Sequence, residues 1–466
     1  MKYVLYLILT TLAGNTITAQ PIIGTWNGLL QVQGTNLRVV FHITSTPTGL
    51  ATTMDSPDQG AKGIPATTTT YTHNTVVIKI NNLKITYEGV VINDSSIQGT
   101  FVQNTLSLPM NLTKAAVALP KLNRPQEPQA PFPYYSEAIT FANTKENITL
   151  AGTLTLPSKQ GIYPTVILIS GSGPQDRDES MAGHKPFLVL AHYLTQHGIA
   201  VLRYDDRGTA LSTGNFSAAT THNLATDVQA AINYLKTRKE VNPKRIGLIG
   251  HSEGGLIAPI VAAHTRDVAY IVLLAGPGLP GDSILLLQQK LIAKAAGISD
   301  ATIRKTEADN RKAFALVHKY SNVPKLRLEL TQLMSTLLQQ YPNSDKPAGI
   351  SNTEYVQAQV SQMTSPWMLN FIKYNPAPTL TKVTCPVLAL NGSKDLQVPA
   401  KQNLQAIRNA LAKGGNKQVT IKELPNLNHL LQECTTGAPS EYSTIEQTIA
   451  PVAMQAILSW LQQQIQ

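Results

Sequence analysis

The chain of 466 residues is long for a single domain, which predicts two or three. Hydrophobic residues make up 42% of it, enough for a globular core, and no internal stretch is long and apolar enough to span a bilayer. The net charge of +10 would suit a nucleic-acid partner, but the basic residues are scattered without interleaved aromatics, which indicates solvated surface and no nucleic acid.

The first residues are typical of an export signal. Met1-Lys2 is a charged start, Tyr3 to Leu9 is a short apolar run, and Ile17-Thr18-Ala19 is an acceptable cleavage site. We therefore expect residues 1–19 to be a signal peptide, with Gln20 as the first mature residue. A membrane anchor is the alternative, but the apolar run is too short for one. The expected protein is periplasmic or extracellular, without stable membrane insertion after cleavage.

Residues 20–118 alternate in short runs rich in threonine, valine and isoleucine, such as Leu37 to Ile43 and Thr75 to Ile80. This pattern predicts a small antiparallel β-domain of seven to nine strands, a barrel or a sandwich. The domain contains no cluster of residues suited to catalysis, and its role stays open between substrate binding, covering the active site and assembly. Residues 119–133 hold five prolines and predict a stiff linker.

From residue 134 onward, apolar strands alternate with amphipathic helices, after a first hairpin between Ser136 and Leu156. This alternation predicts a parallel sheet with helices on both faces. The expected strands are Thr165 to Ile169, Ile199 to Tyr204, Ile246 to Gly250, Tyr270 to Leu274, Val387 to Asn391 and Val419 to Leu424. Residues 277–382 are a predicted helical cap inserted into this domain, and a last helix is expected from Ile445 to about Gln464.

The sequence Gly250-His251-Ser252-Glu253-Gly254 lies between a predicted strand and a predicted helix. Such a turn is so sharp that the side chains around the serine must be nearly absent, which explains Gly250 and Gly254. The turn exposes the hydroxyl of Ser252 above the sheet, and the sequence therefore predicts a nucleophile. The alternative is a glycine-rich turn in which the serine caps the helix.

A nucleophilic serine needs a histidine and a carboxylate, and in a parallel sheet both should follow the carboxyl ends of strands. Asp395 follows one predicted strand and His429 follows the next, in the chain order Ser, Asp, His. The competing acids are Asp282, which lies several residues into the cap, and Glu423, which lies within its strand. We therefore predict a triad of Ser252, Asp395 and His429.

Two backbone N–H groups should stabilise the negative charge that develops on the substrate oxygen. One is that of Glu253, at the start of the helix. The loop Ser170-Gly171-Ser172-Gly173-Pro174 supplies the other; Ser172 is favoured, and Gly171 or Gly173 is possible. A phosphate-binding loop is the alternative, but no G-K-[ST] follows.

Two further residue types are expected to have structural roles. His251, in the turn, should support it and not react. Of the two cysteines, Cys385 opens an apolar strand and suits the core, although export would permit a disulfide with Cys434.

These motifs, with Tyr204-Asp205-Asp206-Arg207-Gly208 and Leu427-Asn428-His429, give the chain from Tyr134 a resemblance to the α/β-hydrolase superfamily. It is most similar to secreted bacterial esterases and serine-aminopeptidase-like hydrolases. The resemblance implies the triad named above, a structural Arg207-Gly208 turn and a cap that shapes the substrate pocket. It also implies that a β-rich front domain is an appendage that determines no substrate.

The expected function is that of a serine carboxylesterase acting on small short-chain acyl esters. No cofactor is expected, and no metal, because no zinc-ligand spacing such as H-E-x-x-H occurs. A serine aminopeptidase-like amide hydrolase is the alternative, and a catalytically silent binding protein is a further one. Trp367, Phe371 and Tyr374, in the cap, either line a pocket or pack. Acyl size and oligomeric state stay open.

Overall fold

The computed structural model describes residues 22–32, 35–47, 49–57, 61–103, 106–116, 123–340 and 351–465. The chain divides into two compact units, with the boundary between Leu119 and Pro120. The expected signal peptide and the start of the expected linker lie outside the described residues. Within the described ranges, no helix is long and apolar enough to cross a membrane.

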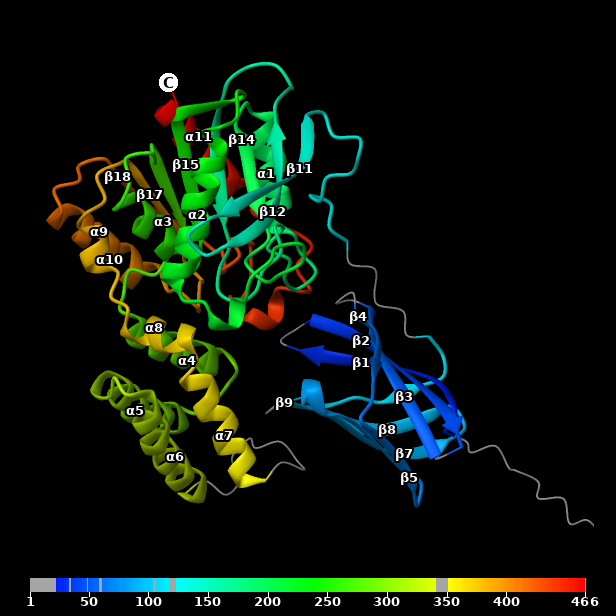
Figure 1. Ribbon diagram of the computed structural model, residues 1–466. Coiled ribbons are helices and arrows are strands. Elements are labelled where there is room, and N and C mark those ends of the chain that lie inside the picture. The colour runs from blue at the N-terminus through cyan, green and yellow to red at the C-terminus, as the bar shows by residue number, and fades with distance from the viewer. Residues whose placement is uncertain are drawn as a thin grey trace, which may run out of the picture. The chain divides into compact units, whose positions relative to one another are not determined.

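The first unit is a ten-stranded sheet in the order β4-β3-β2-β1-β10-β8-β7-β6-β5, with β9 paired to β8 (Figure 1). Its strands are β1 (Gly24–Val32), β2 (Thr35–Thr46), β3 (Gly49–Ser56), β4 (Ala61–Pro65), β5 (Thr68–Thr72), β6 (Thr75–Ile80), β7 (Ile85–Asn93), β8 (Ser96–Gln103), β9 (Leu106–Pro109) and β10 (Leu112–Thr113). The described residues form ten strands, where seven to nine were expected; the shortest, β9 and β10, have four and two residues and show too little alternation to be predicted.

The sheet of the first unit curls on itself. Strands β4 and β5 lie at opposite ends of the strand order, yet they are separated by only Ala66 and Thr67 in the chain. The N–H of Ala66 donates to the Thr52 carbonyl at 2.8 Å, and the Thr69 hydroxyl donates to the Thr52 hydroxyl at 2.8 Å. Because the two ends meet, the domain resembles a barrel and is not a sandwich. Its core includes Trp26, Phe41, Ile78, Tyr87 and Leu112.

The second unit contains an eight-stranded sheet in the order β11-β12-β14-β13-β15-β16-β17-β18. The strands are β11 (Tyr135–Asn143), β12 (Ile148–Leu156), β13 (Tyr163–Ile169), β14 (Ala200–Tyr204), β15 (Val241–His251), β16 (Tyr270–Leu274), β17 (Val387–Gly392) and β18 (Val419–Leu424). β12 is antiparallel to both its neighbours, whereas all pairs from β14 to β18 are parallel. Every residue of β14, β16 and β17 is buried, as expected for parallel strands covered on both faces.

Helices cover both faces of this sheet. α1 (Pro186–Gln196) and α11 (Pro451–Ile465) share one apolar core with the sheet, and α2 (Thr221–Leu235), α3 (Gly254–Ala262) and α10 (Ala400–Lys413) share the other. This is the α/β-hydrolase fold, as predicted. The last helix begins at Pro451 and not at the expected Ile445, because a proline is accommodated in the first helical turn but not inside a helix.

The predicted insertion between β16 and β17 is helical. It contains α4 (Gly281–Ala295), α5 (Asp300–Lys319), α6 (Val323–Gln340), α7 (Asn352–Met363), α8 (Pro366–Lys373) and α9 (Ala377–Leu380). Its inner side chains, such as Phe314, Val317 and Leu330, form a core of their own. A smaller cluster joins Ile284 of α4 and Phe371 of α8 to Leu256 and Val398 of the sheet domain. Two cap helices therefore pack on the domain that bears the predicted nucleophile.

The described end of the expected linker is bound to the second unit. The Arg124 guanidinium donates to the carbonyls of Ser443 and Ile445, at 2.9 and 2.7 Å. The Gln126 carboxamide oxygen accepts from the N–H groups of Thr448 and Ile449. This end of the expected linker therefore binds to residues 443–449, which precede α11, and is not a free spacer.

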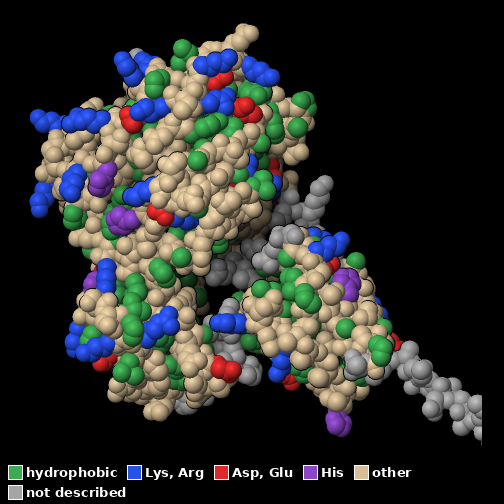
Figure 2. All heavy atoms as spheres, in the orientation of Figure 1, with side chains coloured by type: hydrophobic (Ala, Val, Ile, Leu, Met, Phe, Trp, Pro, Cys, Tyr) green, Lys and Arg blue, Asp and Glu red, His purple; other side chains and the backbone are tan. Residues whose placement is uncertain are grey.

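Cys385 and Cys434 are both free. Burial raises the pKa of the Cys385 thiol to about 11, which suits the expected packing role and keeps the thiol protonated. On the face drawn in Figure 2, lysine and arginine side chains are spread among uncharged ones instead of forming one basic patch.

Candidate active site

Ser252 lies on a sharp turn between β15 and α3. Its φ angle of 52° is in the left-handed region, which residues other than glycine rarely adopt. The strained conformation is held by the neighbouring strand, because the Ser252 N–H donates to the carbonyl of Leu274, at the end of β16, at 2.9 Å. Ser252 is partly exposed, whereas its neighbours His251 and Glu253 are buried. The local structure is the one that the glycine pattern predicts.

The glycines around Ser252 are required by space. A Cβ on Gly250 would collide with the carbonyl of Gly254, and a Cβ on Gly254 would collide with the carbonyl of Ile169. A Cβ on Gly255 would lie 2.6 Å from the Cα of Gly276. The turn can therefore place a helix directly against the sheet only because these side chains are absent.

The structure brings Asp395 and His429 together. Nδ1 of His429 lies 2.8 Å from Oδ2 of Asp395, and both side chains are buried. The other carboxylate oxygen of Asp395 accepts from the N–H groups of Gln397 and Val398, each at 2.8 Å. The carboxylate is thus fixed in orientation and accepts from Nδ1, which leaves Nε2 of His429 as the basic nitrogen.

The two rival acids lie elsewhere. Asp282 accepts from its own neighbour Ser283 and lies 3.1 Å from His318 in the cap. Glu423 is exposed on β18. Of the three carboxylates that the sequence offered, only Asp395 therefore contacts His429 in the described structure.

The loop that bears His429 returns across the end of β17 to the turn at Ser252. Its path is held by Asn428, whose side chain accepts from the N–H groups of Leu430 and Gln432. The rings of His251 and His429 have centroids 4.9 Å apart. Within the described part of the chain no hydrogen bond joins the Ser252 hydroxyl to His429. Catalytic contacts commonly tighten only when substrate binds, so their pairing stays a prediction.

The predicted oxyanion loop lies beside Ser252 because of strand register. β13 and β15 are parallel neighbours with Ile169 opposite Gly250, so the loops that follow them start at the same level. A Cβ on Gly171 would lie 3.1 Å from the Cβ of Ser252. The N–H of Gly171, however, donates to Oε1 of Glu179 at 2.7 Å. Of the three candidate donors, this leaves Ser172 and Gly173.

Glu253 has a second role that the sequence did not indicate. Its side chain is 1% exposed, and its carboxylate accepts from the Trp367 indole N–H of α8 and from the Thr221 hydroxyl. Burial raises the pKa of Glu253, and these donors oppose the rise. The partners Thr221 and Trp367 are 32 and 114 residues away, so no local pattern could reveal them.

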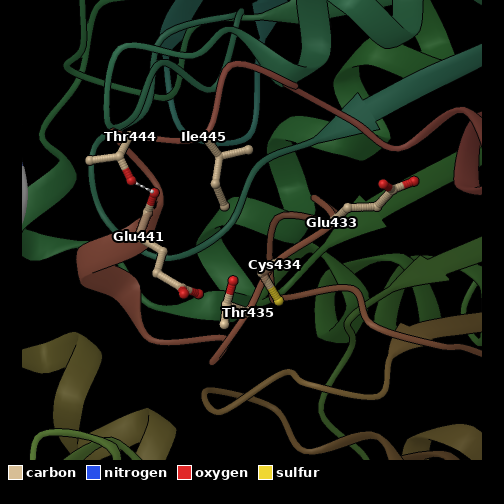
Figure 3. Close-up of a pocket in the computed structure, with 6 residues that line it drawn as sticks. All are labelled: Glu433, Cys434, Thr435, Glu441, Thr444 and Ile445. Carbon is tan, nitrogen blue, oxygen red and sulfur yellow. Dashed lines mark hydrogen bonds between the residues drawn. The ribbon is translucent and has the colours of Figure 1, made fainter.

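A pocket of about 360 Å³ lies in the segment after His429 (Figure 3). It is lined by Glu433, Cys434, Thr435, Glu441, Thr444 and Ile445. Glu441 uses its carboxylate to accept from the N–H groups of Thr436 and Gly437, and burial raises the pKa of the Cys434 thiol. The pocket contains none of the predicted site residues and offers no activated group. Within the described residues, no cluster of His, Cys, Asp and Glu could hold a metal ion.

Residues 185–433, just over half of the chain, match the family described as serine aminopeptidase, S33. The chain belongs to this family. The matched segment of the serine aminopeptidase S33 family contains Ser252, Asp395 and His429, whereas Ser172 and Glu179 precede it. The family is one of serine hydrolases.

Among curated relatives, esterase EstD of Thermotoga maritima is 26% identical over 282 residues, which are 60% of this chain and 58% of that protein. The uncharacterized protein YfhR of Escherichia coli is 30% identical over 171 residues, 34% of this chain and 56% of its own length. The chain thus spans less than two thirds of these relatives. Among solved structures, Pyrococcus furiosus esterase Pf2001 has a TM-score of 0.44 at 14% identity, over 75% of this chain and 100% of that one.

Proposed function

We propose that this S33-family hydrolase is a carboxylesterase that cleaves short-chain acyl esters through Ser252, His429 and Asp395. The observation that carries the proposal is the Asp395–His429 contact of 2.8 Å, in a loop packed against the strained turn of Ser252. The strained turn at Ser252 alone could have a structural role, such as capping the helix that follows it. The buried pair of Asp395 and His429, on the loops that follow β17 and β18, is the arrangement that activates a serine nucleophile.

The mechanism follows from these groups. Ser252 Oγ forms a bond to the ester carbonyl carbon while Nε2 of His429 takes the hydroxyl proton, and the N–H groups of Glu253 and Ser172 stabilise the oxyanion. The carbon–oxygen bond to the alcohol then breaks, and His429 returns the proton to the leaving alcohol. Water repeats the sequence on the acyl-enzyme, releasing the acid and restoring Ser252. His429 becomes an imidazolium once in each half of the reaction, and Asp395 stabilises it both times.

Two observations favour esters over aminoacyl amides. The apolar cluster of Leu256, Ile284, Phe371 and Val398 adjoins both the nucleophile turn and the acid loop, which suits a small acyl group. An aminopeptidase also needs a carboxylate free to bind the substrate ammonium group. Three of the cap acids, Glu307, Asp309 and Asp282, lie against Arg311, Lys312 and His318 respectively. The similarity to EstD, named as an esterase, agrees with this preference.

The first test is Ser252→Ala. Loss of the attacking oxygen should lower kcat for p-nitrophenyl acetate by about 10⁵- to 10⁶-fold, with folding unchanged. Ser283→Ala, at an exposed serine on α4, is the matched control and should keep wild-type turnover. Turnover that survives in Ser252→Ala would assign the nucleophile to another residue.

Two further assays separate the alternatives. Parallel kinetics on short acyl esters and aminoacyl amides distinguish an esterase from an aminopeptidase by the ratio of kcat/KM. A fluorophosphonate probe distinguishes an enzyme from a silent binding protein, because it reacts only with an activated serine. A panel of esters, sugar acetates included, would then define acyl and alcohol preference.

A further inference from the structure

A buried acid–base pair lies directly beneath the nucleophile turn. Glu179 and His251 are 1% and 5% exposed, and Nδ1 of His251 lies 2.9 Å from Oε1 of Glu179. The same oxygen, Oε1, accepts the N–H of Gly171 at 2.7 Å. The other ring nitrogen, Nε2, lies 3.0 Å from the backbone carbonyl of His429. This chain of contacts links the loops that follow β13, β15 and β18.

The hydrogen-bond partners of His251 restrict where its protons can lie. The carbonyl of His429 can only accept, so Nε2 of His251 must bear a hydrogen. A neutral ring would then present the lone pair of Nδ1 to Oε1 of Glu179, an oxygen that already accepts from Gly171. Two lone pairs in contact at 2.9 Å would repel each other. The contact therefore requires a proton between Oε1 and Nδ1, and with that proton on Nδ1 the ring is an imidazolium and Glu179 a carboxylate.

The surrounding charges agree with this arrangement. Burial by itself lowers the pKa of His251, but the charge of Glu179 and its hydrogen bond outweigh burial, and the pKa lies above its ordinary value of 6.5. Asp395 acts in the same direction as Glu179. The other titratable groups that face the pair are His429, through the ring contact, and Asp206, which lies near Glu179.

We propose that Glu179 and His251 form a buried ion pair that positions the oxyanion loop and the His429 loop relative to Ser252. The inference rests on the proposed esterase function and deepens it. Glu179 holds Gly171, the residue before the favoured oxyanion donor Ser172. His251 holds the backbone of the proposed general base. Neither side chain touches the substrate, and both are positioning residues.

The sharpest variant is Glu179→Gln, which keeps shape and removes charge. In the wild type, Oε1 of Glu179 accepts from both Gly171 and His251. The amide oxygen of a glutamine could accept both hydrogen bonds only if His251 stayed a buried imidazolium, and that imidazolium would have lost the negative charge of Glu179. Burial lowers the pKa of His251, and in this variant the charge of Glu179 no longer opposes that effect, so the pKa of His251 falls. As pH rises through that lower pKa the ring loses its Nδ1 proton, the amide NH₂ turns toward Nδ1, and Gly171 loses its acceptor.

Glu179→Gln should therefore lower kcat about 10- to 100-fold with KM changed less than about threefold. Its kcat should also fall relative to that of the wild type as pH rises above neutrality. The matched control is Asp227→Asn, which removes a carboxylate that is also 1% exposed from its pair with Arg207, at 2.8 Å. The control should lose thermal stability but keep the wild-type shape of the pH profile. A Glu179→Gln profile parallel to that of Asp227→Asn would overturn the proposal.

A second measurement does not depend on activity. In ¹⁵N-histidine-labelled wild-type protein at pH 8, where exposed histidines are neutral, His251 should show protons on both ring nitrogens. A ring protonated on Nε2 alone would overturn the ion pair. If the wild type neither hydrolyses esters nor reacts with the fluorophosphonate probe, the proposed function fails, and the ring signals still report on the pair.

Discussion

At the scale of single residues, the site depends on positions where no side chain can be tolerated. Ser252 is held in a left-handed conformation, and the chain on either side of it passes so close to β13 and to itself that Gly250 and Gly254 have no room for a Cβ. The stored backbone strain, on the order of 1–3 kcal/mol, is balanced by the packing of α3 on the sheet. It serves to present the hydroxyl above the carboxyl ends of the strands.

Gly254→Ala tests this account. The added methyl group would meet the carbonyl of Ile169, so α3 must move away from β13 and Ser252 with it. We expect a loss of kcat of at least about 100-fold, with a lower melting temperature. Fluorophosphonate labelling rate and thermal unfolding measure both effects. Wild-type labelling in a folded Gly254→Ala protein would contradict the steric argument.

At the scale of elements, the cap is joined to the nucleophile turn by a polar contact inside an apolar cluster. The indole of Trp367 donates to both oxygens of Glu253, at 2.8 and 2.9 Å, and its ring stacks on Phe371 of the same helix. A buried carboxylate that loses a donor costs on the order of 1–3 kcal/mol. α8 is therefore held to α3 by a bond whose loss is costly.

A double-mutant cycle on Trp367→Phe and Glu253→Gln measures this link. Trp367→Phe keeps the stacked ring but leaves the carboxylate short of a donor, so it should lower the free energy of unfolding by about 1–3 kcal/mol and raise KM. In the Glu253→Gln background the same change should cost less, because no buried charge is left unsatisfied. Urea unfolding and ester kinetics supply the four values. Strictly additive effects would show that the two elements are not coupled through this contact.

At the scale of the whole molecule, acid sensitivity should arise where distant segments meet. His184 is 1% exposed, with Nε2 at 2.8 Å from the carbonyl of Tyr442 and Nδ1 at 2.9 Å from the Thr448 hydroxyl. Burial lowers the pKa of His184 to about 4. The neutral ring is thus a fixed link between the loop before α1 and the segment before α11.

The unfolding free energy should therefore fall as pH drops. Between pH 6.5 and pH 4, His184 is protonated in the unfolded chain but neutral in the folded protein. This difference lowers the free energy of unfolding by about 3 kcal/mol. His184→Gln keeps a donor and an acceptor but cannot be protonated, so its stability should decline less between pH 7 and pH 4.5 in urea unfolding. His222→Gln, at an exposed histidine, should keep the wild-type decline. An unchanged decline in His184→Gln would assign the acid sensitivity to other groups.

Much of the fold could be read from local patterns. The parallel strands were predictable because β16 is continuously apolar and β14 and β17 are mostly so. The sharp turn was predictable because glycines flank Ser252. The start of α11 was misplaced because Ile445 and Ile449 are spaced as on one face of a helix. In the structure, the N–H groups of Thr448 and Ile449 instead bind Gln126. β9 and β10 are too short for alternation to predict them, because pairing across the sheet makes them strands.

The sequence by itself determined the order of the proposed nucleophile, acid and base and the strand ends on which these residues lie, because side-chain periodicity and turn chemistry act over a few residues. The tertiary structure alone decided which carboxylate meets His429, why the N–H of Gly171 is occupied, and that Glu179, Glu253 and Trp367 belong to the site. These contacts join residues that are far apart in the chain. They exist only when neighbouring parallel strands bring their carboxyl ends to one edge, where burial makes each unpaired charge costly.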